Sequence, residues 1–286
     1  MRRERLGIVS YTNVAPLHWG LTATGAENTS YVYGVPSELN AALARREIDL
    51  TLVSSIEFIR HRHEYRALAD FSIATLGSVY SVMLFHLKPW RELTGQRIAV
   101  TNASATSVEL LRVLLAADGI DCELAPTSGN LDELLANGAA GALLIGDAAL
   151  REALRHLPPS GDGPQGRGMT GPSKLRPELF VTDLGEAWYR LTKLPFTFAV
   201  WAAPDDRKPS AGLVQRFRES RWRGLGELAK VAAVEARKLE LPPESVQRYL
   251  ENFRYYLERP DLDGLMAFAK LSDPTFEADQ LRFWDE

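Results

Sequence analysis

Residues 49–55 read Asp-Leu-Thr-Leu-Val-Ser-Ser, a short apolar run that ends in two hydroxyl side chains. An apolar run of this length with polar residues at its ends predicts a buried strand. Ser54 and Ser55 directly follow the run, where a side-chain oxygen can cap the first turn of a helix. The stretch therefore predicts a strand-to-helix junction with a polar turn.

Further elements of the same kind lie on both sides of this stretch. Residues 6–9 and 31–33 predict earlier strands, and a helix opens at Pro36, because proline is favourable in a first helical turn. Residues 97–100 and 142–145 predict strands of a second series. Such alternation of strands and helices predicts an α/β fold in which helices cover a parallel sheet.

The last third of the chain has a different pattern. Beyond Pro209, apolar residues in 246–257 and 262–269 follow helical spacing. So few helices cannot enclose a core of their own, and we therefore expect this tail to pack on the first lobe.

Residues 158–177 contain five glycines and five prolines. This composition is typical of a surface insertion and lacks the strand, helix and Lys-Ser/Thr pair of a phosphate-binding loop.

Composition excludes several classes of function. The chain has 286 residues, enough for two α/β lobes, and a net charge of -4, without the basic stripe that nucleic-acid binding needs. Its one cysteine, Cys122, cannot form an intramolecular disulfide. No uninterrupted apolar run is long enough to span a membrane, and residues 7–13 become polar too soon for a signal peptide. We therefore expect a soluble, cytoplasmic protein.

Small polar residues mark four predicted strand-to-helix junctions, at residues 10–13, 54–55, 104–107 and 146–147. Ligands of open α/β sheets bind outside the carboxyl ends of the strands. Hydroxyl groups and free N–H groups at helix starts can bind carboxylates there without lysine or arginine. The alternative is that each Ser, Thr or Asn only caps its helix.

Metal and cofactor signals are weak. His61 and His63 form an H-x-H without a third ligand nearby, and neighbouring arginines favour a solvated basic face. The usual hydrolase, metalloprotease, dinucleotide and redox motifs do not occur. We therefore expect a site without metal or cofactor.

A resemblance to a known family adds a specific function. Residues 10–17 read Ser-Tyr-Thr-Asn-Val-Ala-Pro-Leu and resemble the S-Y-x-N-x-x-P-L signature of the chorismate dehydratase family, which opens the futalosine route to menaquinone. The resemblance continues in order through residues 35–39, 49–57, 81–85, 106–111, 144–150, 183–188 and 194–201.

The resemblance implies a two-lobed fold like that of type II periplasmic binding proteins, with a mainly parallel sheet flanked by helices in each lobe. It places a discontinuous lobe I at residues 1–86 and 202–286 and lobe II at residues 87–201, with strands near 82–86 and 196–201 as the crossovers. A ligand cleft is expected between the lobes, and the helical C-terminal tail is expected on the first lobe.

The resemblance also implies a reaction. Chorismate would lose water to give 3-[(1-carboxyvinyl)oxy]benzoate, with the hydroxyl leaving C4 and a proton leaving C3. We expect Asn13 and Ser81 to be catalytic. The expected substrate-binding residues are Ser10, Tyr11, Ser54, Ser55, Ser104, Thr106, Ser107 and Asp147.

The base is open at this point. The substrate's own enolpyruvyl carboxylate is one candidate, and Asp147 or Glu57 is the competing one.

Other functions stay possible. A non-enzymatic binding protein for a small carboxylate would share the fold, but it predicts a signal peptide or lipid-anchor cysteine. The related dihydroxynaphthoate synthase begins with a different signature, and a transcriptional effector-binding domain would need a helix-turn-helix before the first strand. We expect a small-molecule substrate and no nucleic acid, membrane or obligate protein partner.

Overall fold

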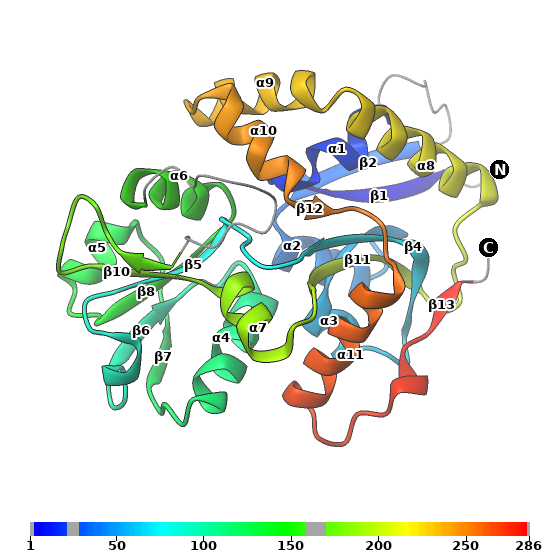
Figure 1. The fold of residues 1–286 in the computed structure, drawn as a ribbon. Coiled ribbons are helices and arrows are strands. Elements are labelled where there is room, and N and C mark those ends of the chain that lie inside the picture. The colour runs from blue at the N-terminus through cyan, green and yellow to red at the C-terminus, as the bar shows by residue number, and fades with distance from the viewer. Residues whose placement is uncertain (1–2, 22–28, 158–169, 285–286) are drawn as a thin grey trace. The chain divides into compact units, whose positions relative to one another are not determined.

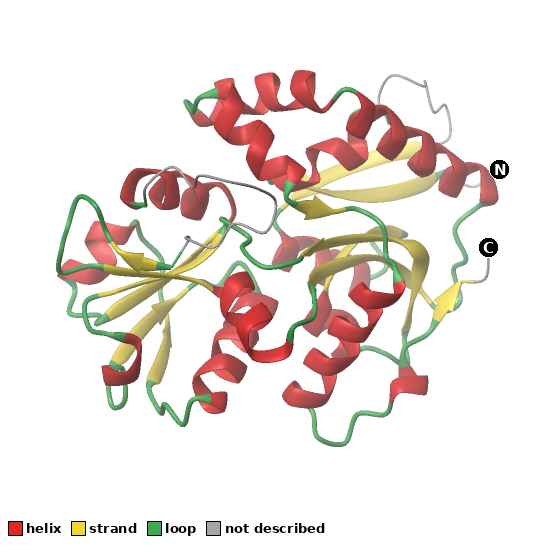
Figure 2. Cartoon of the chain, viewed as in Figure 1, coloured by secondary structure: helices red, strands yellow, loops and turns green. Residues whose placement is uncertain are grey.

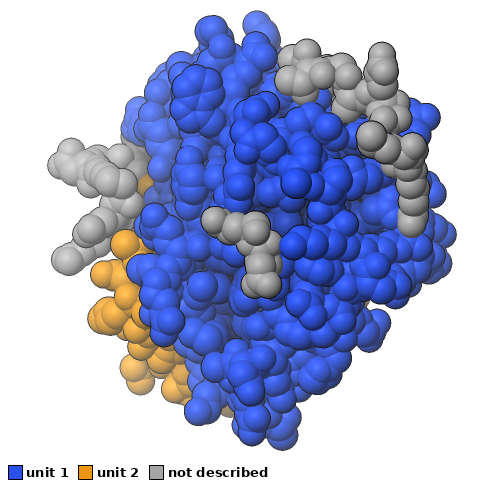
Figure 3. Space-filling model, turned by 90° about the vertical axis from the view of Figure 1, so that its right-hand side faces the viewer, with its two compact units in different colours: residues 1–74, 197–286 blue, residues 75–196 orange. Residues whose placement is uncertain are grey.

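The computed structural model describes residues 3–21, 29–157 and 170–284 (Figure 1). Figure 2 shows helices and strands in both halves of the chain. The chain divides into two compact units, residues 1–74 with 197–286 and residues 75–196, which Figure 3 colours separately. The first unit is therefore discontinuous in sequence.

These divisions differ from the expected lobe boundaries after residues 86 and 201. Strand β5 (Val82–His86) pairs inside the second unit with β8 (Gly141–Ile145) and β10 (Phe180–Asp183). Strand β11 (Phe196–Pro204) instead pairs with β3 (Leu50–Ser54) inside the first unit. Hydrogen bonding thus assigns each expected crossover strand to one sheet, and the chain passes between the units before β5 and at the start of β11.

The described part of the first unit forms one mixed sheet of seven strands in the order β12-β4-β11-β3-β1-β2, with β13 paired to β4. Strand β1 is parallel to both β2 and β3, whereas β11 runs antiparallel to β3. The bounds of the strands not yet given are β1 (Glu4–Val9), β2 (Thr29–Gly34), β4 (Tyr65–Thr75), β12 (Phe253–Arg254) and β13 (Phe283–Trp284).

Helices from both ends of the sequence cover the first unit's sheet. In Figure 1 the helices α8, α9 and α10 lie near α1, and α11 packs against α3. Their bounds are α1 (Ala15–His18), α2 (Pro36–Ala44), α3 (Ser55–Arg60), α8 (Ala211–Gly226), α9 (Leu228–Leu239), α10 (Pro243–Glu251) and α11 (Arg259–Ser272), with short 3-10 helices at Thr12–Val14 and Ala278–Gln280. The C-terminal tail therefore belongs to the first unit, as the sequence predicts.

One part of the prediction for the helical tail is wrong. The helical spacing of residues 246–257 predicts a continuous helix, but α10 ends at Glu251. Residues Phe253–Arg254 form strand β12 at the edge of the first sheet instead, next to β4. Apolar residues at helical spacing are also compatible with a short edge strand, because a helix and a strand can each bury one face.

The second unit has a mixed sheet in the order β7-β6-β8-β5-β10-β9. The expected mainly parallel sheet is found only at β6, which is parallel to β7 and β8, while β5 is antiparallel to β8 and to β10. Helical connections, which parallel neighbours need, lead from β6 to β7 and from β7 to β8. The remaining bounds are β6 (Arg97–Val100), β7 (Glu123–Pro126), β9 (Gly171–Pro172), α4 (Ala105–Ala117), α5 (Leu131–Ala136), α6 (Gly146–His156), α7 (Leu184–Thr192) and a 3-10 helix at Trp90–Glu92.

The Gly/Pro-rich stretch is described only from residue 170, because residues 158–169 lie outside the described residues. Most of the described remainder is at least partly exposed, but part of it has regular structure. Residues Gly171–Pro172 form the edge strand β9, which pairs with β10. Ser173 is buried beside His156, with 2.8 Å between its Oγ and the ring Nδ1. The sheet edge therefore orders a sequence that composition alone predicts to be irregular.

Each sheet carries its own apolar core. Met83, Phe85, Ala142 and Val181 lie at the centre of the second unit's core, on strands that are neighbours in the sheet. Among the described residues, no helix is both long enough and apolar enough to cross a lipid bilayer.

Candidate functional site

Polar residues gather at one edge of the first unit's sheet. Strands β1 and β3 are parallel, so Ser10, which follows β1, and Ser54, which ends β3, lie at the same edge. Strand β11 runs antiparallel to β3 with Ala199 opposite Ser54, so β11 starts at this edge. This is the carboxyl edge at which α/β sheets bind ligands.

Asn13 lies in the turn that follows β1. It belongs to the 3-10 helix Thr12–Val14, which continues into α1 through Pro16. The side-chain Oδ1 of Asn13 is buried and has no hydrogen-bond partner within the described residues. Because a buried amide oxygen without a donor costs about 1–3 kcal/mol, this atom is suited to accept a hydrogen bond from a ligand.

The two serines after β3 have different environments. The Ser55 hydroxyl is buried and donates to the carbonyl oxygen of Thr197 at the start of β11, so it joins two elements of the fold. The Ser54 Oγ accepts a hydrogen bond of 3.4 Å from Nδ2 of Asn40. Ser55 therefore has a structural partner, whereas Ser54 belongs to a polar pair near the sheet edge.

Asn40 is a site candidate that the sequence analysis missed. It is 8 % exposed, and its Oδ1 has no hydrogen-bond partner among the described residues. It lies in α2 between the buried residues Leu39 and Leu43. The signal that could have found it is an amide side chain on the apolar face of a helix, because such a group needs a polar partner.

Ser10 and Tyr11 stand at the start of this turn. Ser10 is exposed, and its backbone N–H donates to the carbonyl oxygen of Gly34 at the end of β2, at 3.1 Å. Tyr11 is partly buried and precedes the 3-10 helix in an extended conformation. Both residues therefore belong to the same polar edge as Asn13.

A second polar edge lies in the second unit. Ser104 follows β6, and Gly146 and Asp147 follow β8, which is parallel to β6. Ser81 precedes β5, which is antiparallel to β8 with Val82 opposite Ile145. The predicted residues of this unit are therefore brought to one sheet edge.

Ser104 is a helix cap, as the alternative reading of its junction predicts. Its Oγ accepts the backbone N–H of Ser107 at 3.2 Å and lies 3.0 Å from the Ser107 Oγ. Thr106 and Ser107 are buried in the first turn of α4. The helix start is thus rich in hydroxyl groups and carries the positive end of the α4 dipole.

Asp147 lies in the first turn of α6 and is not its cap. The cap position is Ile145, and the helix starts at Gly146, whose φ of 60° favours glycine. The backbone N–H of Gly146 donates to the carbonyl oxygen of Ser81 at 2.8 Å. This bond ties the junction that carries Asp147 to the segment that carries Ser81.

The other candidate base and the paired histidines lie on α3 and the turn after it. Glu57 is partly buried, and its Oε1 is 3.3 Å from the His61 Nε2. The His61 Nδ1 is 3.1 Å from Glu64 Oε1. In residues 3–21, 29–157 and 170–284, no three His, Cys, Asp or Glu side chains come together as a metal site.

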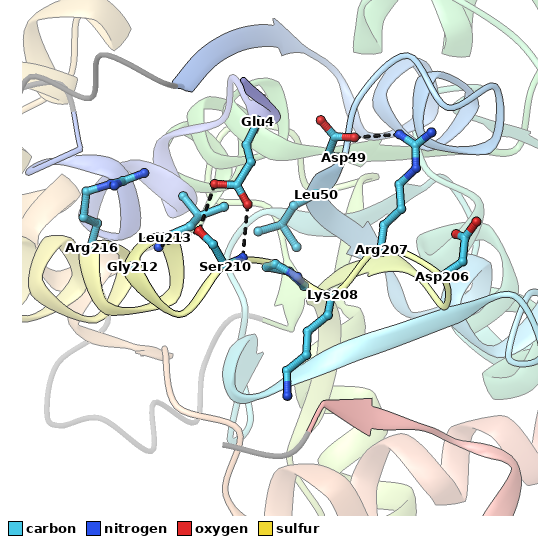
Figure 4. Close-up of a pocket in the computed structure, with 11 residues that line it drawn as sticks. Glu4, Asp49, Leu50, Asp206, Arg207, Lys208, Ser210, Gly212, Leu213 and Arg216 are labelled. Atoms are coloured by element: carbon cyan, nitrogen blue, oxygen red, sulfur yellow. Dashed lines mark hydrogen bonds and ion pairs between the residues drawn. The ribbon is translucent and has the colours of Figure 1, made fainter. Parts of the chain in front are cut away.

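A pocket of about 610 Å³ opens at the opposite end of the parallel strands (Figure 4). It is lined by Glu4, the first residue of β1, by Asp49, which directly precedes β3, and by the start of α8. Glu4 accepts hydrogen bonds from Ser210 N and Oγ at 3.1 and 3.0 Å, and Arg207 Nη1 is 2.6 Å from Asp49 Oδ1. These carboxylates already have internal partners, so the edge with Asn13 is the stronger candidate.

The fold defines the class of protein. A protein of Archaeoglobus fulgidus has the same fold with a TM-score of 0.70 at 17% identity, covering 94% of this chain and 96% of its own. The periplasmic aliphatic sulphonate binding protein of Escherichia coli matches with a TM-score of 0.66 at 14% identity, covering 99% and 92%. The two units are those of a periplasmic-binding-protein-like fold, which confirms the expected fold class.

The family is more specific than the fold. Residues 4–273 match the family described as menaquinone biosynthesis. The chorismate dehydratase of Thermus thermophilus is 43% identical over 270 residues, 94% of this chain and 95% of the relative. The chorismate dehydratase of Campylobacter jejuni is 26% identical over 88% of this chain and 86% of the relative. The chain belongs to this menaquinone biosynthesis family, in agreement with the motif series.

Proposed function

We propose that this protein is an enzyme that removes water from chorismate to give 3-[(1-carboxyvinyl)oxy]benzoate. The observation that carries the proposal is the 43% identity to the Thermus chorismate dehydratase along nearly the whole of both chains. A match over 270 of the 286 residues extends into both units. The cytoplasmic location expected from the sequence stays a prediction, as does the ligand cleft.

In the proposed reaction the C4–O bond breaks, the C3–H bond breaks, and the hydroxyl and proton leave together as water. The ring becomes aromatic, which supplies the driving force, so the protein mainly has to hold one conformer and assist the leaving group. Asn13 would hydrogen-bond the reacting hydroxyl or a carboxylate through its side-chain amide. Its buried Oδ1, which has no partner in the described part of the chain, supports this role, because a substrate hydroxyl could donate to it.

Carboxylate binding would fall to the polar helix starts. Ser81, Thr106 and Ser107 are buried near the carboxyl edge of the second sheet, and the start of α4 adds positive potential without a basic side chain. Ser10, Tyr11, Ser54 and Asp147 complete the proposed substrate-binding set, and Asn40 joins it because its buried Oδ1 has no partner among the described residues.

The proposed base is the substrate's own enolpyruvyl carboxylate. Asp147 and Glu57 are the competing bases, since each is a partly buried carboxylate in the first turn of a helix. The Asp147→Asn variant separates these readings, because it keeps the shape of the side chain and removes its basicity. Turnover that survives in this variant supports the substrate as base, whereas lost turnover with intact chorismate binding favours Asp147.

The function is tested by incubating the purified protein with chorismate, without added metal, and following the aromatic product by chromatography and ultraviolet absorbance. Heat-denatured protein is the control for spontaneous breakdown of chorismate. We expect product to form at a rate proportional to the protein concentration. Absence of product at high protein concentration would contradict the proposal and favour a binding protein for a small carboxylate.

A further inference from the structure

Asp183 is a fully buried carboxylate at the end of β10, 0 % exposed. It caps α7 in the ordinary way, because its Oδ1 accepts the backbone N–H of Glu186 at 3.0 Å. Its other contacts come from a distant part of the chain. Val79 N donates to both carboxylate oxygens, at 3.0 and 2.9 Å, and Tyr80 N donates to Oδ2 at 2.8 Å.

A capping role explains only one of these bonds. A helix cap needs a single side-chain oxygen for the N–H groups of its own first turn, as Asn130 provides for α5. The Oδ2 of Asp183 instead accepts hydrogen bonds from Val79 and Tyr80, and capping α7 does not require these bonds. The carboxylate therefore holds the segment just before Ser81 as well as its own helix.

The segment that Asp183 holds has an unusual backbone. Tyr80 has a φ of 63°, in the left-handed region that non-glycine residues rarely adopt. Such a conformation persists only where the surroundings impose it, and it is common at functional sites. Two N–H groups bound by one buried carboxylate are such a constraint.

Gly185 allows this segment to approach the start of α7. A Cβ at this position would lie 2.5 Å from the carbonyl oxygen of Gly77, closer than any side chain can come. The same carbonyl accepts the Thr75 Oγ1 hydroxyl at 3.1 Å. The segment from Gly77 to Ser81 is therefore pressed onto the junction of β10 and α7.

The bonds continue from this segment to the polar edge. Ser81 is 2 % exposed, and its carbonyl oxygen accepts the N–H of Gly146 at the start of α6. The position of the Ser81 hydroxyl and the position of the Asp147 junction thus depend on the same main-chain segment.

We infer that Asp183 is a positioning residue for the proposed dehydration, which fixes the Val79–Tyr80 main chain and thereby the place of Ser81. The inference rests on the proposed function, since Ser81 is expected there to be catalytic and to hold a substrate carboxylate. Asp183 itself contacts main-chain N–H groups of its own unit. Its effect on turnover comes through geometry, because small misplacements of positioning groups lower the rate strongly.

The test compares Asp183→Asn with Asn130→Ala in the full-length protein. Asparagine keeps an oxygen for Glu186 N, but its NH₂ group replaces Oδ2 and cannot accept from Tyr80 N. Asn130→Ala removes a helix cap of the same unit that holds no other segment. We expect kcat for chorismate to fall about 10- to 100-fold in D183N, with a smaller change in KM, and to stay near wild type in N130A.

Amide hydrogen exchange of residues 79–80 is the second readout, because a purely capping role would not change it. We expect exchange there to accelerate at least about tenfold in D183N and to stay unchanged in N130A. A D183N kcat within twofold of wild type, a loss of kcat equal to that of N130A, or a loss of kcat without faster exchange would each overturn the inference. If D183N does not fold, Gly185→Ala displaces the same segment and is measured in the same two ways.

A failure of the proposed function can be distinguished from a failure of the inference about Asp183. If wild-type protein does not dehydrate chorismate, the proposed function fails, and the exchange comparison alone decides whether Asp183 holds the segment.

Discussion

At the residue scale, the site depends on which polar atoms the fold leaves without partners. Ser55 and Ser104 were both predicted from polar junctions, yet Ser55 donates to Thr197 and Ser104 caps α4. Asn13 and Asn40 instead each keep a buried amide oxygen without a partner among the described residues. The amides are therefore the strongest substrate-binding candidates in the first unit.

Asn13→Ala is the residue-scale prediction. We expect kcat to fall about 100-fold or more, because one hydrogen bond to the reacting group is lost from a buried site. The free energy of unfolding should not fall, since the Asn13 Oδ1 satisfies no other group in the described structure and its burial without a partner is itself unfavourable. Steady-state kinetics and urea denaturation measure the two effects.

Asn137→Ala is the control, because Asn137 is exposed at the end of α5. Unchanged turnover in the Asn13 variant would remove Asn13 from the mechanism.

At the element scale, the turn with Asn13 depends on how closely α8 packs against α1. A Cβ at Gly224 would lie 1.9 Å from the carbonyl oxygen of Pro16, so the two helices meet through a glycine. A Cβ at Gly226, two residues later in α8, would meet no atom of the described residues within 4 Å. The two glycines therefore form a matched pair.

We expect Gly224→Ala to destabilise the protein by about 1–3 kcal/mol or more, because the added methyl group forces the helices apart. Gly226→Ala should be neutral or stabilising by up to about 1 kcal/mol, since alanine favours the helix and meets no neighbour. Thermal and urea unfolding of both variants measure the difference. Equal stabilities would show that the α1–α8 contact can shift freely.

At the scale of the whole molecule, buried histidines couple stability to pH. Burial lowers the pKa of His18 to about 4, with a further contribution from Lys238, and burial also lowers the pKa values of His86 and His156. His18 lies in the first unit and the other two in the second. All three favour the neutral ring in the folded state.

The sign of the pH effect follows from these pKa values. Below pH 6.5, His18 binds a proton in the unfolded chain but not in the folded protein. The contribution of the neutral His18 ring to the free energy of unfolding is therefore complete above pH 6.5 and is lost as the pH falls towards 4. From pH 7 to 5, His18 should account for a loss of at most about 2 kcal/mol. Urea unfolding at both pH values should show a smaller loss in His18→Gln, and an equal loss in both proteins would contradict this origin.

Much of the fold could be predicted because its signals are local. The strands at residues 6–9, 31–33, 97–100 and 142–145 lie within β1, β2, β6 and β8, since short apolar runs between polar turns identify buried strands. The direction of neighbouring strands could not be predicted in the same way. It depends on pairing between segments far apart in sequence, such as β5 with β10.

The sequence by itself determined the strand-to-helix junctions and the family, because both are written in short stretches of residues. Only the tertiary structure decided which junction residues have free polar atoms, where the chain leaves each unit, and that Asp183 holds the segment before Ser81. The physical reason is that hydrogen-bond satisfaction and burial are set by partners distant in sequence. A serine that caps a helix and a serine that binds a substrate look the same until those partners are in place.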